Sequence, residues 1–205
     1  MSGTVYLVGA GPGAVDLLTI RAARLLGEAD IVFHDALVPQ PILTLAVNAQ
    51  KVAVGKRCGR HATAQRFINK RLADAARTHR VVVRLKGGDP LLFGRAQEEI
   101  SYLRSRGIPV VVVPGVTAAL AAGADLGTSL TQRGIARSVA FVTPRVGASE
   151  APSSWIRAVL SADSAAIYMG AGEDPHAALA AFDDFSESYQ ASVKRPLPLF
   201  RRRPA

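Results

Sequence analysis

Short apolar runs alternate with amphipathic segments along the chain as far as Leu126. A strand buried on both faces of a parallel sheet is apolar throughout, whereas a covering helix carries apolar residues three or four positions apart. The alternation therefore predicts an α/β fold built on a mainly parallel sheet. Strands are expected at 5–8, 31–33, 51–54, 81–85 and 110–113, and helices at 17–26 (stopped by Gly27), 64–77, 97–106 and 117–126.

The same pattern restarts after Thr128 and then stops. We predict an N-terminal α/β lobe over residues 1–133, a partial C-terminal α/β lobe over residues 134–185 and a basic tail over residues 186–205. The tail is polar and interrupted by prolines, so no strand is expected in it. The two strands of the second lobe are fewer than the about three that an independent sheet needs. We therefore expect two lobes with a cleft between them, the second one incomplete. Its elements are expected at 139–142 and 165–169 (strands) and at 154–160 and 174–185 (helices).

Composition excludes several classes of protein. With 49% hydrophobic residues, the chain is not disordered throughout. No apolar run approaches the about 20 residues that cross a bilayer, and the first residues lack the basic segment of a signal peptide. Cys58 is the single cysteine, so no disulfide forms within the chain. These features predict a soluble, cytoplasmic protein that does not act at a membrane.

The charge is strongly positive, with 25 Lys and Arg against 16 Asp and Glu and a net charge of +9. Such an excess suits nucleic acid, an acidic membrane or a small polyanionic substrate. Part of it lies in the tail, and the rest gathers at loops rather than along one helix face. That placement favours a small polyanion over nucleic acid. The four histidines show no metal-ligand spacing, so no metal is expected.

Three glycine-containing loops follow expected strands, where open α/β sheets place their ligands. The first, GAGPG at 9–13, lacks the dinucleotide spacing and is either a tight turn or a ligand loop. The second, KGGD at 86–89, lets backbone approach a ligand, and its Asp89 either holds a hydroxyl pair or an ammonium group or caps a helix. The third, PGVTA at 114–118, suits a nucleoside or close packing of helix on sheet. Together they favour a nucleoside-like cation over a dinucleotide.

The ordered set of motifs resembles the tetrapyrrole methylases. GAGPG, followed by DLLT at 16–19 and DALV at 35–38, looks like the opening of that family. Further motifs narrow the likeness to members that methylate uroporphyrinogen III at carbon. They are GKRCGRH at 55–61, RLKGGDP at 84–90, FGR at 93–95 and LTQR at 130–133. Each motif is only moderately specific alone, but their order is highly specific.

The resemblance implies S-adenosylmethionine as methyl donor and co-substrate, with no metal. It implies two successive methylations that convert uroporphyrinogen III to precorrin-2, performed by a homodimer. Carried over position by position, the residues that would line the donor site are Pro12, Gly87, Gly88, Asp89, Thr117, Ala118 and Met169.

The same resemblance places Asp35, Arg95 and Glu98 at the reacting tetrapyrrole, with Glu98 as candidate base. The alternative is that Arg95 and Glu98 form an ordinary surface pair at i and i+3. The substrate implied is an octacarboxylate, which requires guanidinium and ammonium partners. The cations expected to bind its carboxylates are Lys56, Arg57, Arg60, Lys86 and Arg133.

The end of the chain departs from the family pattern, in which further strands and a segment over the adenine follow. We therefore keep a second hypothesis, a non-catalytic truncated remnant that binds tetrapyrrole or dimerises without turnover. A methylase of a later corrinoid intermediate is a closer rival, and the motifs within 55–69 and 93–95 argue against it. A module that binds nucleic acid through the basic surface is the least favoured alternative.

Overall fold

The computed structural model describes residues 3–54, 61–146, 151, 153–170 and 199–201. The chain divides into two compact units, Met1–Ala118 and Ala119–Ala205, and each is considered by itself. This division lies before the boundary predicted after residue 133. The difference arises because Ala119 and Gly123 pack on later residues: the Ala119 N–H donates to Tyr168 Oη at 3.2 Å, and Gly123 approaches the carbonyl of Thr128.

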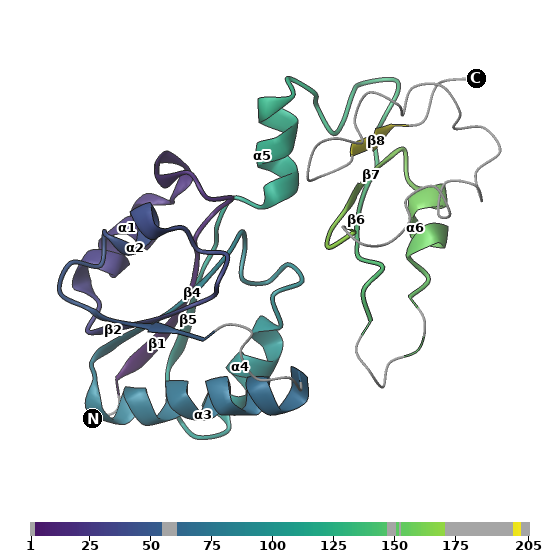
Figure 1. The fold of residues 1–205 in the computed structure, drawn as a ribbon. Coiled ribbons are helices and arrows are strands. Elements are labelled where there is room, and N and C mark those ends of the chain that lie inside the picture. The colour runs from purple at the N-terminus through teal and green to yellow at the C-terminus, as the bar shows by residue number, and fades with distance from the viewer. Residues whose placement is uncertain (1–2, 55–60, 147–150, 152, 171–198, 202–205) are drawn as a thin grey trace. The chain divides into compact units, whose positions relative to one another are not determined.

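The first unit is built on a five-stranded sheet of order β3-β2-β4-β1-β5, in which all strands run parallel (Figure 1). Each strand agrees with its predicted range to within one residue at either end. The parallel sheet predicted from the alternation is therefore confirmed. The strands are β1 (Thr4–Gly9), β2 (Ile31–His34), β3 (Gln50–Ala53), β4 (Val81–Lys86) and β5 (Val110–Val113).

Helices cover both faces of this sheet (Figure 1). The helices α1 (Ile20–Glu28) and α2 (Gln40–Leu43) pack on one face, and α3 (His61–Thr78) and α4 (Ala96–Arg104) pack on the other. Successive side chains of β4 point to opposite faces of the sheet. Val83 joins the core beneath α1 and α2, whereas Val82 joins the core beneath α3 and α4. By the same alternation Arg84 lies on the α3–α4 side, where it is 2% exposed.

The strands β1 and β4 are neighbours, but the chain leaves them toward opposite faces. After β1 it enters α1, and after β4 it enters α4. In open α/β sheets, ligands bind at the carboxyl edge where such a reversal occurs. This edge carries the first and second glycine loops.

The first helix does not stop at Gly27, so that prediction is wrong. The hydroxyl oxygen of Thr19 accepts the Ala22 N–H at 3.2 Å and caps the start of α1, which then runs through Gly27 to Glu28. The stop lies at Ala29, whose backbone is extended. A short 3-10 turn, η1 (Val15–Leu17), precedes this helix. The helix α2 was not predicted, because a segment of four residues with a proline in its first turn shows no helical period.

Gly27→Ala is expected to raise the free energy of unfolding by about 0.5–1 kcal/mol, because glycine weakens a helix interior by that amount relative to alanine. A methyl group at this position meets no atom within 4 Å. Denaturant titration measures the change. A loss of stability would show that α1 is not helical at this residue.

The second unit holds a three-stranded sheet, α5 (Ala118–Asp125, whose first residue closes the first unit) and α6 (Trp155–Ser161). In the sheet, β6 (Val139–Val142) pairs parallel with β7 (Ser164–Ile167), and β8 (Leu199–Arg201) pairs antiparallel with β7. The prediction of a strandless tail and a two-stranded lobe is therefore wrong at 199–201. A strand of three residues is too short to be predicted from its own sequence, but the free edge of β7 offers these residues backbone partners. The helix expected at 174–185 falls outside the described residues.

Within the part of the chain that the structure describes, no helix combines the length and the apolar character that spanning a membrane requires.

Candidate active site

The three glycine loops touch through their backbones at the carboxyl edge of β4, β1 and β5. Gly88 N–H donates to the Gly11 carbonyl at 2.7 Å, and Gly11 N–H donates back to the Gly88 carbonyl at 3.2 Å. A Cβ on Gly9 would lie 2.6 Å from the Cα of Gly115, so neither position has room for a side chain. The missing side chains therefore let the three loops pack backbone against backbone at this edge.

Asp89 ties the second loop to the third. Its Oδ1 accepts the Leu91 N–H at 2.8 Å, and its Oδ2 accepts the Gly115 N–H at 3.0 Å. The helix-cap alternative is wrong, because α4 begins at Ala96 and Arg95 holds the cap position. A carboxylate oxygen has two lone pairs and can accept more than one hydrogen bond. The half-buried Asp89 can therefore also accept hydrogen bonds from ligand hydroxyls.

Asp89→Asn is expected to lower the free energy of unfolding by about 1.5–3 kcal/mol, because two backbone N–H groups lose a charged acceptor. One amide oxygen cannot replace both carboxylate oxygens, and the amide NH₂ would face a donor. Denaturant titration checks this value. Glu28→Gln is the control, since Glu28 forms only an exposed pair with Arg24 at 3.8 Å. Equal losses in the two variants would contradict the tie between loops.

The other residues predicted for the donor site divide between the two units. Pro12 and Gly87 are exposed at the loop surfaces, whereas Thr117 is buried where the third loop enters α5. Ala118 follows as the last residue of the first unit. Met169 belongs to the second unit, where it is 44% exposed with a left-handed φ of 57°. The structure therefore gathers all of the predicted donor residues except Met169 in the first unit.

The loop that leads into α4 is strained. Phe93 and Arg95 have φ angles of 52° and 55°, values that side-chain-bearing residues adopt at a cost of order 1–3 kcal/mol. Between them, a Cβ on Gly94 would lie 2.6 Å from the Pro90 carbonyl oxygen. Strained residues of this kind cluster at functional sites, which agrees with the role predicted for Arg95.

Arg95 and Glu98 form a bidentate pair on the surface. The Nε of Arg95 donates to Glu98 Oε1 at 2.6 Å, and its Nη2 donates to Oε2 at 2.7 Å. Both side chains are about half exposed (44% and 50%). The i, i+3 pair given above as an alternative is thus present, and it leaves both groups accessible to a ligand.

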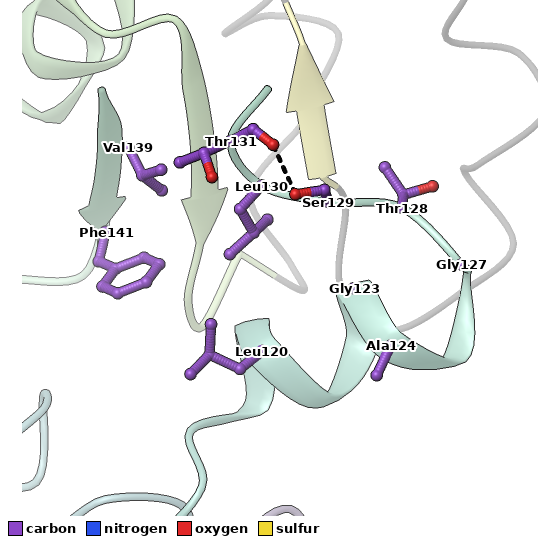
Figure 2. A pocket seen from close by; sticks show the side chains of 10 residues that line it. All are labelled: Leu120, Gly123, Ala124, Gly127, Thr128, Ser129, Leu130, Thr131, Val139 and Phe141. Carbon is purple, nitrogen blue, oxygen red and sulfur yellow. Dashed lines mark hydrogen bonds between the residues drawn. The ribbon is translucent and has the colours of Figure 1, made fainter. Parts of the chain in front are cut away.

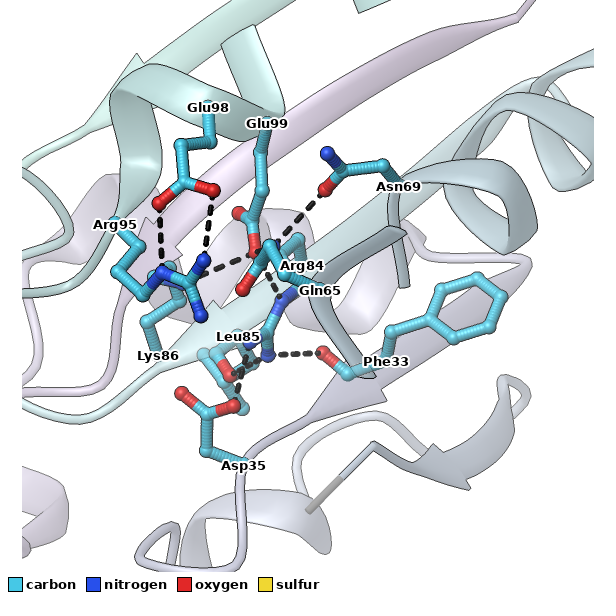
Figure 3. Close-up of polar contacts among 10 residues, drawn as sticks. All are labelled: Phe33, Asp35, Gln65, Asn69, Arg84, Leu85, Lys86, Arg95, Glu98 and Glu99. Carbon is cyan, nitrogen blue, oxygen red and sulfur yellow. Dashed lines mark hydrogen bonds and ion pairs between the residues drawn. The ribbon is translucent and has the colours of Figure 1, made fainter. Parts of the chain in front are cut away.

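A buried network of charges lies beneath Asp35 (Figure 3). Arg84 donates from Nη2 to Asp35 Oδ1 and from Nε to Glu99 Oε1, the latter at 3.2 Å. Lys86 Nζ and Gln65 Nε2 donate to the same Glu99 oxygen, at 3.2 and 3.1 Å. The network joins the end of β2 to β4, α3 and α4.

Gln65, Arg84 and Glu99 are the residues of this network to which the sequence analysis assigned no role. A signal was present, because Arg84 interrupts the apolar run of β4 and a charge inside a buried strand needs a partner. Glu99 follows Glu98 directly on α4, so the two side chains point in different directions, one exposed and one fully buried.

Lys86 does not stand at a ligand surface, as its predicted contact with a substrate carboxylate requires. Its side chain is 5% exposed and paired with Glu99. Burial lowers the pKa of Lys86 below its ordinary value, and the positive charge of Arg84 lowers this pKa further, whereas Glu99 and Asp35 act in the opposite direction. We therefore assign Lys86 to the interior network rather than to the substrate.

The second unit carries the predicted Arg133 at an exposed turn. Gln132 and Ala136 exchange backbone hydrogen bonds at 2.9 and 2.8 Å, and Gly134 has a φ of 80°. Next to this turn lies an apolar pocket of about 510 Å³ (Figure 2). It is lined by Leu120, Gly123, Ala124, Gly127, Thr128, Ser129, Leu130, Thr131, Val139 and Phe141.

Three of the predicted cations, Lys56, Arg57 and Arg60, lie outside the described residues. Within the described ranges, no group of three or more His, Cys, Asp or Glu could hold a metal ion.

Comparison with known proteins decides the family. The sequence profile of the tetrapyrrole (corrin/porphyrin) methylases matches residues 4–193 of the chain. The chain belongs to the tetrapyrrole methylase family.

Solved structures of this family superpose well. Uroporphyrin-III C-methyltransferase from Thermus thermophilus, in complex with S-adenyl homocysteine, is 38% identical with a TM-score of 0.77, over 97% of this chain and 83% of that one. Another crystal structure of the Thermus thermophilus enzyme is 44% identical with a TM-score of 0.69, over 86% and 72% of the two chains. The predicted α/β tetrapyrrole methylase fold is confirmed.

Curated relatives are longer proteins. Siroheme synthase 1 of Klebsiella pneumoniae is 48% identical over 170 residues, which are 82% of this chain and 36% of the relative. A siroheme synthase of Pseudomonas fluorescens is 49% identical over the same length. The chain thus spans about a third of the length of these relatives.

Proposed function

We propose that this chain is an S-adenosylmethionine-dependent C-methyltransferase that converts uroporphyrinogen III to precorrin-2 by two successive methylations. The observation that carries the proposal is the packing of the three glycine loops on one another through Gly9, Gly88 and Gly115, in a chain similar to a methyltransferase solved with S-adenyl homocysteine. The similarity to siroheme synthases supports a reaction on a tetrapyrrole.

The residues at this edge fit the donor. A nucleoside needs close backbone approach and a carboxylate for its hydroxyls, and the glycine loops with Asp89 offer both. We propose that Pro12, Gly87, Gly88, Asp89, Thr117, Ala118 and Met169 hold it. The donor supplies a methyl group on a positively charged sulfur, which is already activated for transfer. The chain therefore acts mainly by aligning the two reactants and excluding water.

For the acceptor we propose Asp35, Arg95 and Glu98 at the reacting face, with Lys56, Arg57, Arg60 and Arg133 as further partners for carboxylates. The Arg95–Glu98 pair is exposed, so a substrate carboxylate can replace Glu98 on the guanidinium. Glu98 is then released to accept the proton that leaves the methylated ring.

We further propose that the protein works as a homodimer in the cytoplasm. The resemblance to a dimeric family supports the dimer, and the single Cys58 suits a reducing compartment. Sedimentation at several concentrations tests the dimer.

Calorimetric titration with S-adenosylhomocysteine tests the donor half of this proposal. We expect saturable binding at one site per chain. A folded protein that does not bind it would contradict the methyltransferase and favour the alternative, a remnant that holds tetrapyrrole without turnover. Titration with a stable uroporphyrin would then measure that remaining activity.

A further inference from the structure

Four charged side chains are connected within the first unit, and their formal charges cancel. Arg84 and Lys86 on β4 face Glu99 on α4 and Asp35 after β2 (Figure 3). Three of them have side chains no more than 5% exposed, whereas Asp35 is 32% exposed. Asp35 is therefore the member of this network that solvent reaches.

Glu99 is the centre of the network. Its Oε1 receives Arg84, Lys86 and Gln65 at 3.1–3.2 Å. Among the described residues none bonds its buried Oε2. The three donors thus converge on one oxygen, which fixes the guanidinium and the ammonium group relative to each other.

Each of the two cations contacts a part of the chain that carries a residue proposed to bind the methyl acceptor. Arg84 donates from Nε to Glu99 and from Nη2 to Asp35, so Glu99 helps to orient the guanidinium that holds Asp35. The Nη1 of Arg84 donates to the carbonyls of Leu85 and Phe33 at 3.2 and 3.5 Å. The stem of Lys86 packs beneath the strained loop: a Cβ on Gly94, the residue before Arg95, would lie 3.2 Å from Lys86 Cε.

We propose that Glu99 is a positioning residue for the methyl acceptor, which holds Asp35 through Arg84 and supports the Phe93–Arg95 loop through Lys86. This inference rests on the proposed function, because the roles of Asp35 and Arg95 do. The network meets the second glycine loop at its first residue, Lys86. The hydrogen bonds of Gly88 and Asp89, by contrast, run to the backbone of Gly11, Leu91 and Gly115.

Glu99→Gln tests the proposal with little change of volume. The variant leaves two buried cations facing each other with Asp35 as their one anion, so Arg84 and Asp35 shift. The number of active sites is counted by titration with S-adenosylhomocysteine, and turnover of uroporphyrinogen III is divided by that number to give kcat per binding site. We expect this kcat to fall by about tenfold to a hundredfold. The dissociation constant of S-adenosylhomocysteine should stay within about twofold.

Asn69→Ser is the matched control. Asn69 is buried on the same face and accepts from Gln65 at 2.9 Å, but has no bond to Arg84 or Lys86. It should leave kcat per binding site within about twofold, because it perturbs the core without moving the cations. If Glu99→Gln does not fold, Arg84→Lys decides, because a lysine cannot bridge Glu99 and Asp35 together.

The outcomes separate this inference from the proposed function. No turnover by the unchanged protein overturns the proposed function and, with it, the role of Glu99. Turnover by the unchanged protein, with an undiminished kcat per binding site in Glu99→Gln, overturns the inference alone. An equal fall of kcat per site in Asn69→Ser also overturns it, because any damage to this core would then suffice.

Discussion

Arg95→Ala is expected to abolish methyl transfer while leaving the binding of S-adenosylhomocysteine within a few-fold of its original strength. The side chain is proposed to hold a substrate carboxylate and to free Glu98 as base, and losing such groups costs about a hundredfold to ten-thousandfold in rate. Its contacts with Glu98 are exposed, so folding should change by no more than about 1 kcal/mol. Product formation and calorimetry measure the two quantities.

The control for Arg95→Ala is Arg24→Ala, which removes the Arg of another exposed Arg–Glu helix pair. It should keep full turnover. Complete loss of donor binding in Arg95→Ala would contradict the role assigned to Arg95, because that residue would then belong to the donor site or to the folding of the loops.

Gly115→Ala is expected to weaken S-adenosylhomocysteine binding by about a hundredfold and to lower the free energy of unfolding by about 1–3 kcal/mol. A methyl group there overlaps the carbonyl oxygen of Gly88 and the backbone of Gly9. Backbone atoms cannot turn aside as a flexible side chain does, so the loops must separate. Calorimetry and denaturant titration report the two effects.

Gly27→Ala serves as the control for Gly115→Ala, since its added methyl group meets open space. It should leave donor binding unchanged. Normal donor affinity in Gly115→Ala would show that contact among the three loops is not what forms the donor site.

The first sheet could be predicted closely because buried parallel strands are nearly all apolar. β1, β2, β4 and β5 are mainly apolar runs, and β5 agrees at both ends. The edge strand β3 differs, because it begins with exposed Gln50 and Lys51. The second unit was less predictable. The strand β8 is three residues long and depends on the edge of β7, a contact distant in sequence that no local pattern reveals.

Within the site, the glycine loops could be predicted from the sequence, but the buried network of charged side chains next to them could not. The glycines and Asp89 are local signals, since each follows a strand. The pairing of Arg84 with Glu99 depends on how α4 packs on the sheet, so Lys86 was assigned to the substrate although it lies inside. Neighbouring Glu98 and Glu99 differ only in the helix face they occupy.

The proposed reaction is tested most directly by incubating the purified protein with S-adenosylmethionine and uroporphyrinogen III and measuring the mass of the tetrapyrrole product by mass spectrometry. We expect the product to gain one methyl group and then a second. A protein that binds S-adenosylhomocysteine but leaves the mass of uroporphyrinogen III unchanged would contradict the proposed reaction.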